Sequence, residues 1–169
     1  MTYQPFDIGT KFRIAPVGCS PSGDRIDLVM QRGAFGSGEH QTTRSCLELM
    51  ENLADLEAAE VLDLGSGTGI LAIAALKLGA SHAVCVDIEA QAVETAMANC
   101  VLNHLERRTT HMTGTLAEVF QTGFDVVLAN IYGDILIDLA APLSGKLTQG
   151  GALLLSGILW EYNFDGRQA

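Results

Sequence analysis

Three alternating glycines, Gly65, Gly67 and Gly69, close the stretch VLDLGSGTG and lead into a long helical pattern. Glycines at a turn from a strand into a helix let backbone amides approach a ligand and point the helix N-terminus at it. Asp87 ends the next β-branched run, about 20 residues further on, where a carboxylate can bind both hydroxyls of a ribose. Together these features predict a site for a cofactor that contains a ribose.

The spacing of the glycines narrows the class of cofactor. A dinucleotide fingerprint requires GxGxxG, whereas the third glycine here comes one residue earlier, which disfavours a nicotinamide dehydrogenase. No GK[ST] follows either glycine-rich stretch, so phosphoryl transfer at a P-loop is excluded. The GxGxG spacing resembles the first motif of S-adenosylmethionine-dependent methyltransferases. A glycine turn that serves packing alone is the alternative interpretation.

A second glycine-rich stretch, GAFGSGEHQTT at residues 33–43, precedes the predicted core strands and has no lysine for a phosphate. We interpret it as a lid over the cofactor, with Phe35 and Thr43 as its contacts and its glycines allowing it to open. Thr43 has an alternative role as a helix N-cap, which Thr42 would fill equally well. His40 forms no ligand-spaced set with the other histidines or the cysteines, so no metal site is predicted.

The elements that must position these residues alternate between strands and helices from Glu60 onward, which is typical of βαβ units. The predicted fold is α/β, a doubly wound, mostly parallel sheet of Rossmann-like type with helices on both faces. We expect strands at 60–64, 82–87, 108–113, 125–130 and 152–159, and helices at 42–56, 68–78, 89–103, 115–121 and 132–147.

The first 32 residues are rich in turn-forming residues and differ in this respect from the rest of the chain. Two strand-like stretches, KFRIAPV and RIDLVM, predict a small β-hairpin there. We therefore divide the chain into an N-terminal hairpin-like extension at 1–32 and a methyltransferase domain at 33–169.

Composition restricts the partners. The chain has 169 residues, a formal net charge of -10 and 48% hydrophobic residues. A sequence-independent surface for nucleic acid needs an excess of lysine and arginine, so direct nucleic-acid binding is disfavoured, and a basic protein partner or a small molecule fits better. No apolar run approaches the length of a membrane span, and four cysteines without CxxC pairing favour a reduced, cytoplasmic setting.

Five sequence blocks resemble one family closely, the bacterial ribosomal protein L11 methyltransferases, called PrmA. In chain order they are AFGSGEHQTT, VLDLGSGTGILAIAALKLGA, CVDIEAQAVETAMANC, VVLANIY and GGALLLSGIL. The resemblance implies the class I S-adenosylmethionine-dependent methyltransferase fold and methylation of protein amino groups. It also implies that Thr43, Gly65, Asp87 and Asn130 bind the cofactor, that Phe35 lies over it, and that Asn130 lies beside its methyl group.

The chemistry of these residues agrees with such roles. Methyl transfer mainly requires a nucleophile held about 3 to 3.5 Å from the methyl carbon in a site that excludes water. A lysine amine, with a reference pKa of about 10.4, must arrive unprotonated, and the side-chain oxygen of Asn130 can orient its N–H bonds. Asn130 also has an alternative interpretation, as a turn residue that leaves a strand.

The chain departs from the family pattern at both ends. The resemblance implies a separate substrate-recognition domain, which residues 1–32 are too short to form, and two further strands after GILW. The sequence ALLLSGIL would then form an exposed apolar edge, so we expect either a homodimer through this strand or a fragment of a longer chain. The alternatives to a protein N-methyltransferase are an inactive or regulatory cofactor-binding domain and a small-molecule methyltransferase.

Overall fold

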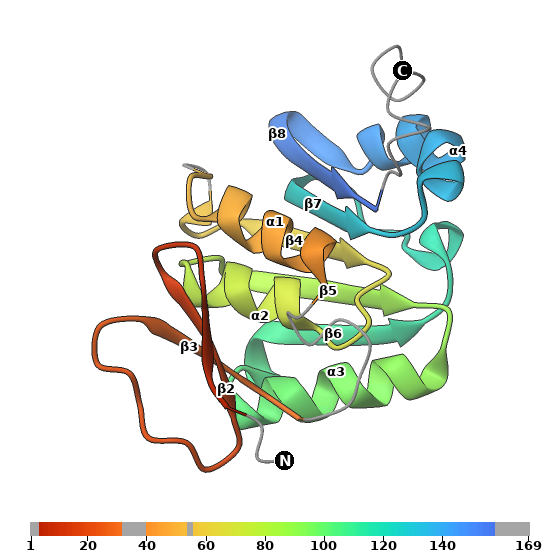
Figure 1. Cartoon of the computed structure of the whole chain (residues 1–169). Helices are drawn as coiled ribbons and strands as arrows, with labels where there is room; N and C mark the ends of the chain where they lie inside the picture. Colours follow the sequence, from red (N-terminus) through yellow and green to blue (C-terminus); the bar gives the residue numbers. More distant parts are fainter. Residues whose placement is uncertain (1–3, 32–39, 54–55, 158–169) are drawn as a thin grey trace.

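The computed structural model describes residues 4–31, 40–53 and 56–157. Its centre is a parallel sheet in the order β6-β5-β4-β7-β8, which confirms the predicted doubly wound α/β fold (Figure 1). The chain moves outward from β4 to β6, then crosses back to β7 on the other side of β4. The strands are β4 (Glu60–Leu64), β5 (His82–Asp87), β6 (Thr109–Thr113), β7 (Phe124–Asn130) and β8 (Leu147–Ser156).

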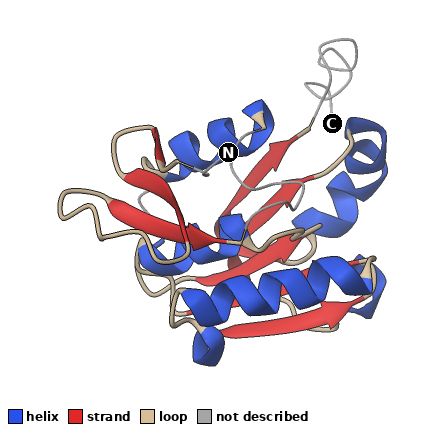
Figure 2. Cartoon of the chain, turned by 60° about the horizontal axis from the view of Figure 1, so that its bottom comes forward, coloured by secondary structure: helices blue, strands red, loops and turns tan. Residues whose placement is uncertain are grey.

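Helices cover both faces of this sheet (Figure 2). One face carries α1 (Gln41–Met50), α2 (Ile70–Lys77) and α3 (Ala90–Leu102), and the other carries α4 (Gly133–Ser144) and the short 3-10 helix η3 (Leu116–Glu118). Successive strand side chains alternate between the two cores: Val61 is buried in the first and Leu62 in the second. This double burial explains why the central strands β4, β5 and β7 are almost continuously apolar.

Helix and strand ends differ from the sequence prediction where packing decides them. The predicted helix at 115–121 is only the 3-10 turn η3, because Phe120 is 91% exposed and only Leu116 and Val119 bury apolar side chains there. The helix predicted at 132–147 ends at Ser144, and β8 begins at Leu147 rather than at residue 152. A second 3-10 turn, η2 (Glu106–Arg108), precedes β6.

The N-terminal segment forms a second sheet rather than the predicted hairpin. It contains β1 (Phe6–Ile8), β2 (Phe12–Pro16) and β3 (Ile26–Met30), in that spatial order. The two strands expected to pair as a hairpin, β2 and β3, run parallel, and the antiparallel partner of β2 is β1. The predicted hairpin of these two stretches is therefore wrong: the connection at 17–25 returns the chain to the start of β2, and β1 with β2 forms the antiparallel pair.

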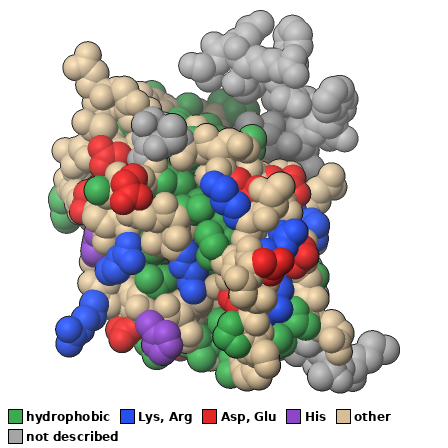
Figure 3. Space-filling view, turned by 90° about the vertical axis from the view of Figure 1, so that its left-hand side faces the viewer, with side chains coloured by type: hydrophobic (Ala, Val, Ile, Leu, Met, Phe, Trp, Pro, Cys, Tyr) green, Lys and Arg blue, Asp and Glu red, His purple; other side chains and the backbone are tan. Residues whose placement is uncertain are grey.

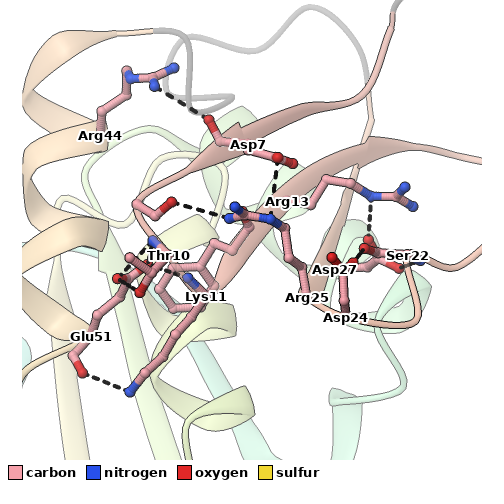
Figure 4. A network of polar contacts seen from close by, with 12 residues as sticks. Asp7, Thr10, Lys11, Arg13, Ser22, Asp24, Arg25, Asp27, Arg44 and Glu51 are labelled. Atoms are coloured by element: carbon pink, nitrogen blue, oxygen red, sulfur yellow. Dashed lines mark hydrogen bonds and ion pairs between the residues drawn. The ribbon is translucent and has the colours of Figure 1, made fainter.

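Glu51, just after α1, attaches this small sheet to the rest of the protein (Figure 4). Its carboxylate accepts the backbone N–H groups of Thr10 and Lys11 at 2.9 and 2.8 Å and the Thr10 hydroxyl at 2.7 Å. The Lys11 ammonium donates back to the Glu51 carbonyl at 2.7 Å. The β1–β2 turn is thereby held against the C-terminal end of α1.

The outer side of the molecule near this sheet carries charges of both signs. Cationic and acidic side chains are interspersed there (Figure 3), and two pairs join directly, Arg13 with Asp27 at 2.6 Å and Arg25 with Asp7 at 3.2 Å. Charges that neutralise one another in this way do not form the single-sign field that attracts nucleic acid. In the described part of the chain, no helix has the length and hydropathy to cross a membrane.

Candidate functional site at the carboxyl ends of β4, β5 and β7

A large cavity of about 1450 Å³ opens where β4, β5 and β7 end. Open α/β sheets place their ligands at this edge, at the point where the strand order reverses. Here the order reverses at β4, since β5 and β7 flank it on opposite sides. Among the residues that line the cavity are Thr43, Asp63, Gly65, Gly67, Asp87, Ile88, Glu89, Leu116, Asn130 and Tyr132.

The glycine turn between β4 and α2 forms one wall. Gly65, Gly67 and Gly69 all have positive φ, of 69°, 53° and 76°, so the turn has a backbone that other residues rarely adopt. A Cβ on Gly65 would also lie 2.2 Å from Cγ2 of Ile131. The backbone N–H of Gly65 donates to the carbonyl of Val86 at 2.8 Å, which fastens the turn to β5.

Asp87 lies at the end of β5, and its carboxylate joins two loops of the cavity. One oxygen accepts the N–H of Gly67 at 2.8 Å, and the other accepts the N–H of Glu89 at 3.0 Å. Each carboxylate oxygen has a further lone pair. The predicted pair of features, the glycine turn and the acidic residue, is therefore in direct contact.

Thr43 and Asn130 meet on the opposite wall. The Asn130 amide Nδ2 donates to the Thr43 hydroxyl at 3.3 Å, although the two residues are 87 positions apart. Thr43 lies inside α1 and is 2% exposed, while the N-cap is His40, so the interpretation of Thr43 as a helix cap is wrong. Asn130 is the last residue of β7 and pairs with Ser156 of β8.

Two further residues were singled out from the sequence, Phe35 and His40. Phe35 and the rest of 32–39 lie outside the described residues. His40 lines the cavity, with Nδ1 2.9 Å from the Thr42 hydroxyl. Within the described ranges, no group of histidine, cysteine, aspartate or glutamate side chains is arranged to hold a metal ion.

Asp63 is a residue of the cavity that the sequence reasoning missed. It is 1% exposed, and one carboxylate oxygen accepts the N–H of Ala72 in α2 at 3.1 Å. Burial raises the pKa of Asp63 to about 7, against the opposing effect of the Ala72 N–H, and the neighbouring Asp87 adds to the rise. An acidic residue inside the apolar run VLDL was the available signal, because a buried strand rarely carries a carboxylate without a role.

Comparison with known proteins places this geometry in a family. Residues 1–165 match the model of the family described as "Ribosomal protein L11 methyltransferase (PrmA)". The ribosomal protein L11 methyltransferase of Pelobacter propionicus is 45% identical over 166 residues, which cover 94% of this chain and 53% of the relative. That of Geobacter metallireducens is 44% identical, with 97% and 55% covered. The chain thus spans about half the length of these relatives.

A solved structure agrees over nearly the whole chain. The crystal structure of ribosomal protein L11 methylase from Lactobacillus delbrueckii subsp. bulgaricus superposes with a TM-score of 0.87 and 31% identity, covering 98% of this chain and 86% of that one. The resemblance inferred from the sequence blocks is confirmed by both kinds of comparison. With its glycine turn, acidic strand end and parallel sheet, this chain belongs to the ribosomal protein L11 methyltransferase (PrmA) family.

Proposed function

We propose that this chain is an S-adenosylmethionine-dependent N-methyltransferase that modifies amino groups of ribosomal protein L11. The observation that carries the proposal is the convergence of the glycine turn, Asp87, Thr43 and Asn130 on one cavity. Membership of a methyltransferase family supports the activity, and the names of the relatives support the substrate. The residues around this cavity must then suit both the cofactor and an amine.

The chemistry of the wall fits S-adenosylmethionine. This cofactor carries a positive sulfonium, an ammonium and a ribose, and the cavity presents the carboxylates of Asp87 and Glu89 and the carboxyl group of Asp63. Its volume of about 1450 Å³ exceeds the roughly 300–1,000 Å³ of ordinary small-molecule sites. We infer that the cofactor and the end of an acceptor side chain occupy it together.

We assign cofactor binding to both walls. In this proposal Gly65 and Gly67 approach the cofactor through their backbone, Asp87 accepts the ribose hydroxyls, and Thr43 and Asn130 face it from the other side. Phe35 is assigned as a further cofactor contact. The bound cofactor supplies an electrophilic methyl group on sulfur. The residues of the chain have to hold an amine in line with that group and keep water away.

Asn130 is the proposed catalytic residue. Because its Nδ2 donates to Thr43, its oxygen Oδ1 is the end of the amide that can accept an N–H from the incoming amine. An amine oriented by this oxygen directs its lone pair at the methyl carbon. No strong general base is required at that step, provided that the amine arrives unprotonated.

The remaining assignments concern partners, location and domains. We infer that the substrate offers a basic surface to this acidic chain, and that the protein acts in the cytoplasm, where its proposed substrate is assembled into ribosomes. A homodimer through β8 is supported by the position of that strand at the edge of the sheet, where β7 is its one neighbour among the described strands. The division of the chain at residues 32 and 33 stays a prediction.

Incubation of the purified chain with methyl-labelled S-adenosylmethionine and purified ribosomal protein L11 tests the proposal. We expect label on L11 amino groups, located by mass spectrometry, and label at a rate at least tenfold lower with the Asn130→Ala variant. Tight cofactor binding without labelled protein in a whole-cell extract would support an inactive or regulatory domain instead. Label confined to the small-molecule fraction would support a small-molecule methyltransferase. Sedimentation velocity of the same sample decides between monomer and dimer.

A further inference from the structure

Two buried asparagines, Asn99 in α3 and Asn103 at its C-cap, form the hydrogen bonds that a neighbouring strand would make along β3. Val29 donates its N–H to Oδ1 of Asn103 at 3.0 Å, and its carbonyl accepts from Nδ2 of Asn103 at 2.7 Å. One turn earlier on the helix, Oδ1 of Asn99 accepts the N–H of Gln31 at 2.9 Å. Val29 and Gln31 are two positions apart, so both point away from β2, toward the edge of β3 that β2 does not use.

Asn99 differs from Asn103 in what its other end does. The Nδ2 of Asn99 donates to the carbonyl of Thr68 at 2.9 Å, and Thr68 stands between Gly67 and Gly69 in the glycine turn. The Nδ2 of Asn103 instead donates to the carbonyl of Asn99 at 2.8 Å, within α3. The side chain of Asn99 therefore joins the glycine turn to the segment that follows β3, whereas the side chain of Asn103 joins β3 only to α3.

The surroundings leave Asn99 little freedom. Its side chain is 0% exposed, and Thr68 is 1% exposed. A Cβ built on Gly69 would lie 3.1 Å from the Cβ of Ala96, so α3 lies close against the turn on the same side. A buried amide with both ends bonded holds its partners at fixed positions, because each unmade bond leaves a desolvated polar group.

We propose that Asn99 is a positioning residue for the cofactor site, which sets the glycine turn by holding the Thr68 carbonyl and couples it to the N-terminal sheet through Gln31. The proposal rests on the proposed function, since it treats this turn as part of the cofactor wall. Gly67 is the link to the ligand: its N–H is held by Asp87, the proposed ribose acceptor. Displacement of Thr68 then moves the amide that orients Asp87.

Three variants separate positioning from general stability. Asn99→Ala removes both contacts, and Asn99→Asp keeps an acceptor for the Gln31 N–H while replacing the donor to Thr68 by an oxygen. Asn103→Ala is the matched control, because it unpairs two backbone groups of β3 without touching the turn. Urea unfolding gives the stability of each variant, and calorimetric titration with S-adenosylhomocysteine gives its dissociation constant.

We expect both Asn99 variants to weaken S-adenosylhomocysteine binding at least fivefold, and Asn103→Ala to stay within twofold of wild type at a similar loss of stability. Equal dissociation constants for the Asn99 and Asn103 variants would overturn the proposal. Amide hydrogen exchange without ligand gives a second reading: Gly67 and Gly69 should exchange faster in Asn99→Ala than in Asn103→Ala. If wild type binds no S-adenosylhomocysteine, the proposed function fails, and this exchange comparison still decides the role of Asn99.

Discussion

The Asn130 amide and the Thr43 hydroxyl meet across 3.3 Å, joining the end of β7 to the first turn of α1. Thr43 is almost fully buried and Asn130 is half-buried at the cavity wall, and the hydrogen bond between them holds the amide in one orientation. In the proposed reaction that orientation decides which end of Asn130 receives the amine. Both residues should therefore affect turnover more than cofactor affinity.

We predict that Asn130→Ala lowers kcat at least tenfold and changes the dissociation constant of S-adenosylhomocysteine less than threefold. Thr43→Val keeps the shape of the side chain and removes the acceptor, so we expect a smaller loss in kcat from a misoriented Asn130. Initial rates with L11 and calorimetry measure the two parameters. Thr110→Val is the control, since Thr110 lies on the distant edge strand β6, where its hydroxyl contacts His82 of β5. Wild-type turnover in both site variants would remove Asn130 from catalysis.

Asp87→Asn should weaken S-adenosylhomocysteine binding about tenfold. The substitution keeps the size of the side chain but removes a charged acceptor, and hydrogen bonds to charged groups are worth about 1.5–3 kcal/mol. Asp125→Asn is a matched control at the opposite end of the sheet, where that carboxylate accepts the N–H of Glu60 at 2.9 Å. Calorimetry on both variants checks the prediction. A change below threefold for Asp87→Asn would count against its ribose role.

Gly65→Ala should abolish cofactor binding and destabilise the fold. Its φ of 69° is strained for alanine, and the added Cβ would meet the Ile131 side chain at 2.2 Å. Gly123→Ala isolates the backbone strain, because Gly123 has a φ of 82° and an added Cβ would have no heavy atom within 4 Å. We expect thermal unfolding to show a loss of about 1–2 kcal/mol for the control and clearly more for Gly65→Ala. Similar losses in the two variants would mean that the Ile131 contact relaxes without cost.

Asp63 should make stability depend on pH in a definite direction. Burial raises its pKa from the ordinary 3.8 to about 7, so over that range the folded state keeps a proton that the unfolded state has lost. The stability that it contributes is complete below about pH 4 and is lost as the pH rises through about 7. Asp63→Asn should therefore gain in free energy of unfolding over wild type as the pH rises, by at most about 4 kcal/mol.

Urea unfolding of wild type and Asp63→Asn at a series of pH values measures this difference. It should grow between about pH 4 and 7 and level off above about pH 8. Asp125→Asn, run in parallel, reports how an aspartate outside the cavity behaves. If the free energies of unfolding of wild type and Asp63→Asn differ by a constant amount over this range, Asp63 is ionised in the folded state without cost.

The stability that Glu51 contributes should depend on pH in the opposite direction. Partial burial would raise its pKa, but the donors from Lys11 and Thr10 outweigh it and lower the pKa below the ordinary 4.5. The attachment of the β1–β2 turn is then present above pH 4.5 and is lost as the pH falls through the lowered pKa.

An NMR titration of the Thr10 and Lys11 amides checks this expectation. Their shifts in wild type should change with a midpoint below pH 4.5 and should lose that step in Glu51→Gln. Glu48→Gln, in the last turn of the α1 helix that Glu51 follows, should leave the step in place. A midpoint at the ordinary value would show that these donors do not outweigh the effect of burial.

Local signals in the sequence were sufficient for the main sheet and for most of the candidate site. The strand prediction at 60–64 and at 82–87 matches β4 and β5, because apolar runs bounded by turn residues encode buried parallel strands directly. Gly65 and Asp87 could be assigned to one site from the chain order alone. Parallel strands deliver their carboxyl ends to the same edge, wherever the rest of the chain packs.

Such local signals did not predict the contacts between segments that are distant in the sequence. The parallel pairing of β2 with β3, the meeting of Thr43 with Asn130, and the Asn99 bridge to Thr68 all depend on which helix packs against which strand. The raised pKa of Asp63 depends likewise on burial by elements remote in the chain. The sequence by itself determined the order of strands and helices and the glycine turn, since these follow from local periodicity and spacing. It also determined the family, through the resemblance of its sequence blocks. Only the tertiary structure decided which polar groups share a buried hydrogen bond, because that requires three-dimensional proximity and the exclusion of water.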